Sequence, residues 1–581
     1  MSIAIMGKDK AGAQVVAKGR VVRKYTADIS AIGEPWLWAL GGALAIGIIL
    51  IAGFLFMIFW NGVATFWPQP IHVVTLVDGQ MVAGEPTRES TYRVGPELLA
   101  TLSPEARAEV EDSGGYADRI LYRTGNYDLY NEDFRWVSQF EVASVEAPSG
   151  FYLFERQEWG RFVGKIAGLT LDEDRKDISS LSYGEIRRHQ AEARKRWDAI
   201  RYIEKSEIGR VNHYIEQERL KLRKAELRYG VDAPLYASAA AEAEPHIAEL
   251  QREFAALAER AATLKAEDAR YRIVLEEIGG RTKETNLSQI VRLYPANDVS
   301  SPQKVGIYLS RWGEFLGSEP REANTEGGVL PAIFGTVVMT LIMVVIVAPF
   351  GVVTALYLRE YATQGKLVAA VRIAVNNLAG VPSIVYGVFG VGFFAYTMGA
   401  SIDQLFYPER LPSPTFGTGG ILWAALTLAL LTVPVVIVAS EEALAAVPRS
   451  MREGSLACGA SKWQTIRYVV LPRALPGVMT GLILAMARGA GEVAPLMLIG
   501  VVKLAPELPI DGFAPFIHLE RSFMHLGFHI FDVGFQSRNS EAGKPMVFVT
   551  TLLLLFLIVA MNSSAIYIRN RLKRKFAVGQ F

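Results

Sequence analysis

Two charged residues, Arg488 and Glu492, lie four positions apart in an otherwise apolar stretch of the sequence. Residues at this spacing share one face of a helix, so the two side chains can meet. The guanidinium of an arginine presents a planar fork of donors that matches the oxygens of an oxyanion. A carboxylate beside it would repel a fully deprotonated dianion, but it can accept a hydrogen bond from an anion that still carries a proton. The pair therefore has the chemistry of a binding site for a protonated oxyanion.

The alternative is a mutual ion pair that only holds helices together. A charge within a bilayer costs at least ~2.5–3.5 kcal/mol, so such residues normally face a partner or an aqueous pathway. Gly481, Gly489 and Gly491 allow another backbone or a solute to come close, which favours the pathway. We hypothesise that Arg488 attracts the anion and that Glu492 selects its protonated form. Phosphate carries a proton near neutral pH, whereas sulfate does not.

A second group of polar residues interrupts another apolar stretch, where Asn376 and Asn377 are followed by Pro382, Ser383 and Tyr386. Proline can break an intramembrane helix where neighbours or water satisfy the freed carbonyls. In the functional interpretation Asn377, Ser383 and Tyr386 line a substrate pathway. The alternative is a helix kink whose amides are satisfied within the protein.

The apolar stretches that surround these residues are long enough to cross a membrane, which takes about 20 residues. Six such stretches are present, at 36–60, 330–358, 367–398, 420–440, 475–502 and 546–568. The first has Trp36 and Trp38 at one end and Trp60 and Trp67 at the other, as expected for the two interfacial aromatic belts. We expect an all-α polytopic membrane protein with six transmembrane helices.

The distribution of Lys and Arg predicts the orientation of the chain, because cytoplasmic loops favour both residues. Basic residues fill the tail 1–35, the loop 441–473 and the tail 569–581. These three segments are therefore expected in the cytoplasm, and an even number of spans agrees. The charge-rich block 61–328 is then an extracytoplasmic insertion, and the region 329–568 completes the membrane domain.

The insertion has two kinds of pattern. Residues 71–170 hold short alternating runs broken by Gly, Pro and Asn, which predicts strands. Residues 183–278 have apolar residues at helical spacing, and the stretch "YGVDAPLY" at 229–236 would break the helix into an antiparallel hairpin.

Two later runs, "YRIVLEEI" and "SQIVRLY", are candidates to return to the sheet, and residues 318–328 are predicted to be a linker. The insertion therefore has an α+β pattern. A structural spacer is the interpretation that we favour, and a sensory or partner-binding domain is the alternative.

The loop between the fourth and fifth spans contains "EGSLACGASKWQTIRYVVLP" at 453–472. Gly459 can adopt a positive φ, so a short helix can end there and the chain can turn. Pro472, with its fixed φ, is expected to start the next segment. A short helix on the cytoplasmic face can receive force from a soluble motor protein.

This loop resembles that of ABC importer permeases, in which Glu-Ala-Ala is followed after three residues by Gly, and after nine more by Ile-x-Leu-Pro. Here Gly-Ser follows Glu453, and Val469 replaces the Ile. The resemblance implies that residues 454–465 form coupling helices that dock in a groove of an ATPase subunit. The coupling residues that it implies are Glu453, Gly459, Ala460, Ser461, Leu471 and Pro472.

Several kinds of chemistry have no motif in this sequence. No GxxxxGK[ST] loop is present, so ATP hydrolysis is expected in a separate polypeptide that binds ATP and Mg. Cys458 is the single cysteine, which rules out a disulfide within the chain, and the seven histidines show no HExxH pattern. We therefore expect no enzyme activity, no metal site and no cofactor in this chain.

The stretch from 447 to 497 resembles the PstA-type phosphate permease, and so do residues 327–341, 356–362 and 381–390. Arg488 and Glu492 match the charged positions of that family's Ala-Arg-Ala-x-Gly-Glu-x-Ala-Pro stretch, with Gly489 in place of an Ala. The likeness covers about 327–568 and the first span, and it implies a type I ABC importer permease fold. The insertion at 71–326 is the main departure.

The resemblance also implies partners. These are a second, PstC-type permease subunit, a dimer of PstB-type ATP-binding subunits and a periplasmic PstS-type phosphate-binding protein, assembled in a bacterial inner membrane. The expected mechanism is alternating access around an intramembrane anion site. The rival hypotheses are a permease for another oxyanion such as sulfate or molybdate, a membrane-anchored sensor or scaffold, and a channel.

Overall fold

The computed structural model describes residues 35–172, 174–176, 182–505, 507–537 and 540–577. The chain divides into two compact units, Met1–Ile58 and Phe59–Phe581. The predicted basic N-terminal tail lies outside the described residues, except for its last position.

The first unit contains most of one long helix, α2 (Pro35–Ala64). Its candidate span, Trp38–Ala64, has a mean hydropathy of 2.7, and only 6% of that window is buried. A helix that is apolar on every side is stable in a bilayer rather than in water. By length and composition, α2 can therefore cross a membrane.

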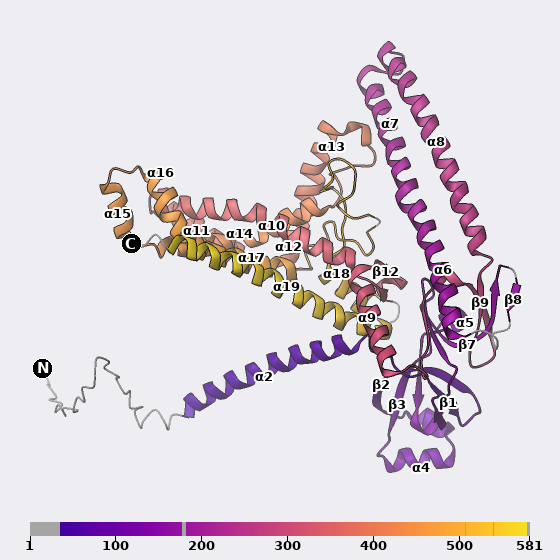
Figure 1. The fold of residues 1–581 in the computed structure, drawn as a ribbon. Helices are drawn as coiled ribbons and strands as arrows, with labels where there is room; N and C mark the ends of the chain where they lie inside the picture. Colours follow the sequence, from indigo (N-terminus) through magenta and orange to yellow (C-terminus); the bar gives the residue numbers. More distant parts are fainter. Residues whose placement is uncertain (1–34, 173, 177–181, 506, 538–539, 578–581) are drawn as a thin grey trace, which may run out of the picture. The chain divides into compact units, whose positions relative to one another are not determined.

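The second unit begins with two antiparallel sheets, labelled in Figure 1. The first has the order β4-β3-β2-β1-β5, with bounds β1 His72–Leu76, β2 Met81–Arg93, β3 Tyr116–Arg123, β4 Phe134–Ser138 and β5 Val142–Glu146. The second has the order β10-β9-β7-β6-β11, and β8 pairs with β7. Its bounds are β6 Tyr152–Arg156, β7 Arg161–Leu171, β8 Asp174–Lys176, β9 Arg272–Glu276, β10 Thr282–Asn286 and β11 Ile290–Pro295. Three short helices connect strands of the first sheet: α3 (Pro96–Thr101) and α4 (Pro104–Asp112) between β2 and β3, and α5 (Tyr127–Tyr130) between β3 and β4.

The two sheets share a core. Val73 and Ala83 of the first sheet pack in one buried cluster with Leu153, Val163 and Tyr294 of the second. The strands β9 and β11 come from the two late apolar runs, and they pair with β7 and β6 respectively. The chain thus leaves the second sheet after β8, forms the long helices, and returns to the same sheet.

Those long helices form a hairpin, visible at the top of Figure 1. One arm contains α6 (Tyr183–Tyr202), a π-helical turn at Ile203–Glu207 and α7 (Ile208–Tyr229), and the other is α8 (Pro234–Asp268). Gly230, with φ of 82°, ends α7, and Pro234 occupies the first turn of α8. A glycine after one helix and a proline inside the next are typical stop and start signals, and they explain the position of the break.

Residues 318–328 are not a linker, contrary to the sequence prediction. After α9 (Ser301–Gly317), two short strands, β12 (Pro320–Arg321) and β13 (Glu326–Gly327), pair with each other. Asn324 is only 2% exposed, and its side chain donates hydrogen bonds to Asp532 and to the carbonyl of Lys503. A polar composition predicted a loop, but the side-chain amide of Asn324 can be buried because its N–H groups find acceptors.

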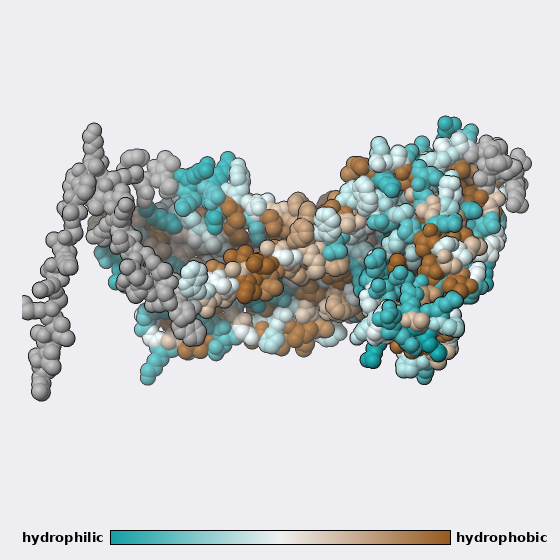
Figure 2. Space-filling model, turned by 90° about the horizontal axis from the view of Figure 1, so that it is seen from below, coloured by the Kyte–Doolittle hydropathy of each residue, from teal (hydrophilic) through white to brown (hydrophobic). Residues whose placement is uncertain are grey.

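Five more helical stretches are long and apolar enough to cross a membrane: Leu330–Tyr361, Ser383–Phe406, Ile421–Ala445, Lys462–Gly491 and Glu541–Arg574. They correspond to α10 (Leu330–Leu356), α12 to α13 (Ser383–Phe406), α14 (Ile421–Ala445), α16 to α17 (Lys462–Gly491) and most of α19 (Ser540–Ala577). In Figure 2 hydrophobic surface gathers over these helices, whereas the surface of the insertion is largely hydrophilic. Together with α2, the described residues hold six candidate spans.

Two of the predicted spans have the wrong bounds. The predicted third span, 367–398, is interrupted: α11 (Lys366–Leu378) ends before a turn, and the span itself begins at Ser383. The residue before a proline avoids helical backbone, and Pro382 accounts for this break. The predicted fifth span, 475–502, begins earlier and ends at Gly491, because residues 494–500 form turns rather than helix.

Helix α14 lies at the centre of the membrane domain. It packs against both α10 and α17, and 67% of its apolar window is buried, compared with 33% for each of its neighbours. A Cβ at Gly351 of α10 would lie 2.5 Å from Val436 of α14, and a Cβ at Gly481 of α17 would lie 2.5 Å from Ala439. Small residues at these crossings let the helices approach closely, as is usual in membranes.

Candidate functional site

The charged pair predicted from sequence lies at the end of α17 (Leu471–Gly491). The Nε of Arg488 is 3.4 Å from Oε1 of Glu492, and the side chains are 36% and 21% exposed. Glu492 does not continue the helix, as the spacing argument assumed. It has extended backbone and is the C-cap residue. Carbonyl groups at a helix C-terminus favour a cation, so the last turn of α17 itself stabilises Arg488.

Most donors of Arg488 remain open to another partner. Within the described part of the chain, its Nε donates to Glu492 and its two terminal nitrogens make no hydrogen bond. An anion can therefore bind the terminal nitrogens without breaking an existing bond. The geometry is that of a loose ion pair with unused donors.

Tyr386, on α12 (Ser383–Phe389), is the predicted pathway residue that lies near Arg488, whose guanidinium interacts with it electrostatically. Its side chain is 4% exposed, and its hydroxyl donates a 2.6 Å hydrogen bond to the carbonyl of Leu378. That carbonyl belongs to the last turn of α11, directly before the break at Pro382. Tyr386 therefore satisfies a carbonyl freed by the helix break, which supports the structural alternative for this residue.

The other two predicted pathway residues are farther along the same segment. Asn377 is exposed on α11, and Ser383 is half-buried at the first position of α12. Among the described hydrogen bonds, none joins either side chain to Arg488 or Glu492. A pathway role for Asn377 and Ser383 stays a prediction.

The three glycines near the pair have different roles. Gly481 and Gly489 allow helix packing, since a Cβ at Gly489 would lie 2.5 Å from Sδ of Met343 on α10. A Cβ at Gly491 would meet no atom within 4 Å. Only Gly491, beside the charged pair, thus has the open surroundings that the pathway argument assumed for all three.

The predicted coupling loop consists of two short helices joined at Gly459. Helix α15 (Arg449–Ala457) ends there with a φ of +83°. The N–H of Gly459 donates to the carbonyl of Leu456 at 2.9 Å, and the N–H of Ala460 donates to that of Ser455 at 3.2 Å. This pair of bonds is a Schellman motif, which needs a residue that tolerates positive φ.

The second short helix starts immediately. Ser461 caps α16 (Lys462–Thr465) through a capping box. The N–H of Gln464 donates to the hydroxyl of Ser461, and the N–H of Ser461 donates to the side-chain oxygen of Gln464. A π-helical turn at Ile466–Val470 then joins α16 directly to α17. Leu471 and Pro472, both half-buried, therefore lie within one continuous helical stretch, and Pro472 does not start a new segment as the sequence suggested.

Polar contacts hold the loop against the spans. Arg452 pairs with Glu360 at 2.9 Å and also donates to the carbonyls of Leu444 and Val447. The hydroxyls of Ser455 and Thr465 lie 2.9 Å apart and tie the two short helices together. The outer surface of the loop is left exposed, and it includes Glu453, Gly459, Ser461, Leu456 and Trp463.

The insertion also contains a group of buried charges that was not predicted from the sequence. Glu155, on β6, is 5% exposed and forms ion pairs with Arg292 and Arg311. Burial alone would raise the pKa of Glu155, but the two guanidinium groups hold it well below its usual range. The signal was available in the alternation of β6, because Glu155 shares a strand face with the fully buried Leu153.

Residues 348–574 match the family model of the binding-protein-dependent transport system inner membrane component. Over these residues, the chain is similar to the permease domains of ABC importers. In that class the ATPase activity resides in a separate subunit, and the permease itself is not catalytic.

Individual relatives indicate which kind of ABC permease this chain resembles. The phosphate transport system permease protein PstA 1 of Mycobacterium tuberculosis (strain CDC 1551 / Oshkosh) is 39% identical over 173 residues, which cover 30% of this chain and 51% of that protein. The probable ABC transporter permease protein YqgH of Bacillus subtilis (strain 168) is 37% identical over 204 residues, which cover 34% of this chain and 62% of that protein. The alignments thus span between half and two thirds of these relatives, and they support a PstA-type ABC permease.

A solved structure of the methionine ABC transporter MetNI in an inward-facing conformation also matches. It is 20% identical, with 42% of this chain and 95% of that chain covered and a TM-score of 0.32.

Proposed function

We propose that this chain is a permease subunit that moves inorganic phosphate across the bacterial inner membrane by alternating access. The observation that carries the proposal is the Arg488–Glu492 pair, which leaves the terminal nitrogens of Arg488 unused at the end of α17. The sequence likeness to PstA-type permeases supports the choice of phosphate.

The chemistry of the pair suits a protonated phosphate. Two of the anion's oxygens can accept from the terminal nitrogens of Arg488, and charge-assisted bonds of this forked kind are the strong ones. The carboxylate of Glu492 then accepts from the P–OH group. A fully deprotonated anion offers Glu492 no donor and is repelled by it, so the same two residues attract phosphate and discriminate against sulfate.

In this proposal the chain works in an assembly. A second, PstC-type permease subunit completes the pathway, a PstS-type binding protein delivers phosphate from outside, and a dimer of PstB-type subunits binds ATP and Mg. The ATPase dimer docks on the coupling loop, residues 441–473, which lies in the cytoplasm together with both termini. The insertion, residues 61–328, then lies on the outer side of the membrane.

Uptake of labelled phosphate by the complete transporter in proteoliposomes tests the proposal. We expect Arg488→Gln to reduce uptake at least ten-fold, which corresponds to about 1.4 kcal/mol and to the loss of one charge-assisted hydrogen bond. We expect Glu492→Gln to keep more uptake than Arg488→Gln but to make it more sensitive to competing sulfate. Near-normal phosphate uptake in both variants would contradict the proposed site.

Two controls separate the site from general damage and from a different substrate. Arg410→Gln changes an exposed arginine outside the site and should leave uptake unchanged. Excess sulfate or molybdate should not compete with phosphate in the unmodified transporter. Strong competition by either anion would assign the permease to that oxyanion instead.

A further inference from the structure

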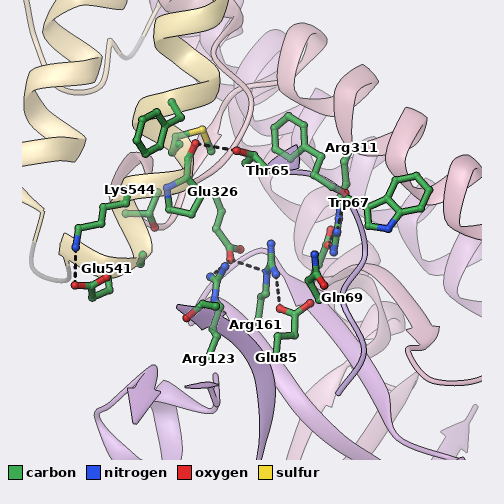
Figure 3. Close-up of a pocket in the computed structure, with 18 of the residues that line it drawn as sticks. Thr65, Trp67, Gln69, Glu85, Arg123, Arg161, Arg311, Glu326, Glu541 and Lys544 are labelled. Atoms are coloured by element: carbon green, nitrogen blue, oxygen red, sulfur yellow. Dashed lines mark hydrogen bonds and ion pairs between the residues drawn. The ribbon is translucent and has the colours of Figure 1, made fainter. Parts of the chain in front are cut away.

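A cavity of about 420 Å³ lies where the insertion meets residues 61–69 and the first turns of α19. One wall carries charged side chains of the insertion, and Figure 3 shows several of them pointing toward each other. Seven cationic and five anionic side chains line the cavity, which gives it a formal charge of +2: Arg88, Arg123, Arg161, Arg292, Arg311, Arg321 and Lys544 against Glu85, Glu155, Glu314, Glu326 and Glu541. A cavity with a surplus of positive charge favours an anion.

In one half of this wall, the arginine donors already have hydrogen-bond acceptors. Arg311 donates to Glu155 through Nε and one terminal nitrogen, and it also donates to the carbonyl of Phe66 and the hydroxyl of Tyr294. Arg292 is bound by Glu155 as well. These donors have their acceptors already, so this half of the wall is structural.

The other half of the wall has unused donors. Arg123 and Arg161 share Glu326, at 2.6 Å and 3.4 Å, and Arg161 also pairs with Glu85 at 2.6 Å. One terminal nitrogen of each arginine, Nη1 of Arg123 and Nη2 of Arg161, makes no hydrogen bond to any described residue. Burial and the neighbouring guanidinium of Arg161 lower the pKa of Arg123, although Glu326 and Glu85 oppose this. The two guanidinium groups therefore have fewer acceptors than they can use.

The opposite wall has an apolar part. It is formed by Ala64 at the end of the first span, by Phe66 and Trp67 just beyond it, and by Met546 and Phe548 of α19, whereas Thr65, Glu541 and Lys544 make the rest of this wall polar. A cavity with a cationic wall and an apolar part opposite it matches a phosphate group that is attached to an apolar molecule, and its volume exceeds what a bare phosphate ion needs.

We propose that this cavity binds a phosphate group through Arg123 and Arg161, supplied either by the headgroup of an anionic lipid or by free inorganic phosphate. A phosphate supplies the missing acceptors for the two arginines and offsets the surplus positive charge. In the lipid case the acyl chains lie along the apolar part of the opposite wall. This site is separate from Arg488 and does not depend on the proposed transport function.

Native mass spectrometry of the purified full-length chain tests the site with three probes: phosphatidylglycerol, the phosphate-free lipid diacylglycerol, and inorganic phosphate. Specific binding of phosphatidylglycerol over diacylglycerol identifies a lipid headgroup, and binding of inorganic phosphate alone identifies the free ion. We expect Arg123→Gln to weaken binding of the identified probe about ten-fold or more, because a charge-assisted donor is lost.

Two further variants make the result specific. Ala64→Phe occupies the cavity without removing a charge, and it should also abolish binding. Arg210→Gln removes an exposed arginine that pairs with Glu253 on the hairpin, and it should bind the probe as the unmodified chain does. Thermal unfolding of each variant verifies that it is folded.

The proposal is overturned if the folded, unmodified chain binds neither phosphatidylglycerol nor inorganic phosphate. It is also overturned if Arg123→Gln and Ala64→Phe bind the probe as well as the unmodified chain does. If Arg123→Gln does not fold, Ala64→Phe decides the question alone, because it keeps every ion pair of the charged wall.

Discussion

Two Arg–Glu sites of this molecule use the same chemical groups in opposite ways. In the insertion, Glu155 and Arg311 are 6% and 5% exposed, and 2.5 Å separates their nearest atoms. In the membrane domain, Arg488 and Glu492 are 36% and 21% exposed, and the corresponding distance is 3.4 Å. Every contact of Arg311 is made within the fold, whereas the terminal nitrogens of Arg488 make no hydrogen bond within the described residues.

The difference separates a structural ion pair from one that is available to a ligand. A buried pair with saturated donors resists the entry of a third charge, because that charge would have to replace several bonds at once. A partly exposed pair with one long contact contributes little to stability, typically ~0–1 kcal/mol, and exchanges partners easily. The following predictions test this distinction, in order of decreasing effect.

Glu155→Gln should produce the largest change, a loss of roughly 3–5 kcal/mol in the free energy of unfolding. The substitution leaves Arg292 and Arg311 buried without their shared carboxylate. Chemical denaturation of the purified chain measures this loss. A change below about 1 kcal/mol would show that the pair is not the structural element described above.

Arg488→Gln should give the converse result. We expect at least a ten-fold loss of phosphate uptake together with a change of less than about 1 kcal/mol in the free energy of unfolding, because the pair is partly exposed. Uptake and denaturation are measured on the same preparation. A variant that is as strongly destabilised as Glu155→Gln would place Arg488 in the structural class.

Acid should weaken the insertion through Glu155. The folded pKa of this residue is held below the usual 4.5, so its stabilising contribution is present above pH 4.5 and is lost as the pH falls toward the folded value. While Glu155 stays ionised in the folded state, the loss is about 1.4 kcal/mol for each pH unit below 4.5. The difference in unfolding free energy between the unmodified chain and Glu155→Gln should shrink accordingly, and a pH-independent difference would contradict the assignment.

The smallest effect is expected at an ion pair on the hairpin surface. Arg210 and Glu253 are 50% and 44% exposed and lie 2.8 Å apart. Arg210→Gln should change the free energy of unfolding by less than about 0.5 kcal/mol, because solvent and salt screen the pair. A larger loss would mean that the N–O distance decides the strength of these ion pairs, rather than their burial and the number of their donors that already have acceptors.

The sequence identified long periodic features well. The apolar stretches corresponded to six candidate spans, and the positive φ of Gly459 followed from the residue type and its place between two helical segments. These features depend on local composition and on backbone preferences that a single glycine or proline determines. The third and fifth spans were misplaced because hydropathy does not register the breaks before Ser383 and after Gly491.

Features that depend on distant parts of the chain could not be predicted. Residues 318–328 have the composition of a loop, and only their contacts with Lys503 and Asp532 show that they are part of the core. The network around Glu155 joins β6 to β11 and α9, and the paired residues of β11 and α9 lie 137 and 156 positions after Glu155. The hydrogen bond from the Tyr386 hydroxyl to the carbonyl of Leu378 likewise spans the break at Pro382, whereas the pathway role of Tyr386 stays a prediction.

The continuous helix from Lys462 to Gly491 has a mechanical consequence. Its 30 residues extend over about 45 Å at 1.5 Å per residue, with the exposed Trp463 near one end and Arg488 near the other. A π-helical turn joins the two parts, and Pro476 lies within α17. A lever of this length converts a tilt of about 10° at one end into a displacement of about 8 Å at the other. A small rotation at the exposed loop can thus move the end of α17 that carries Arg488.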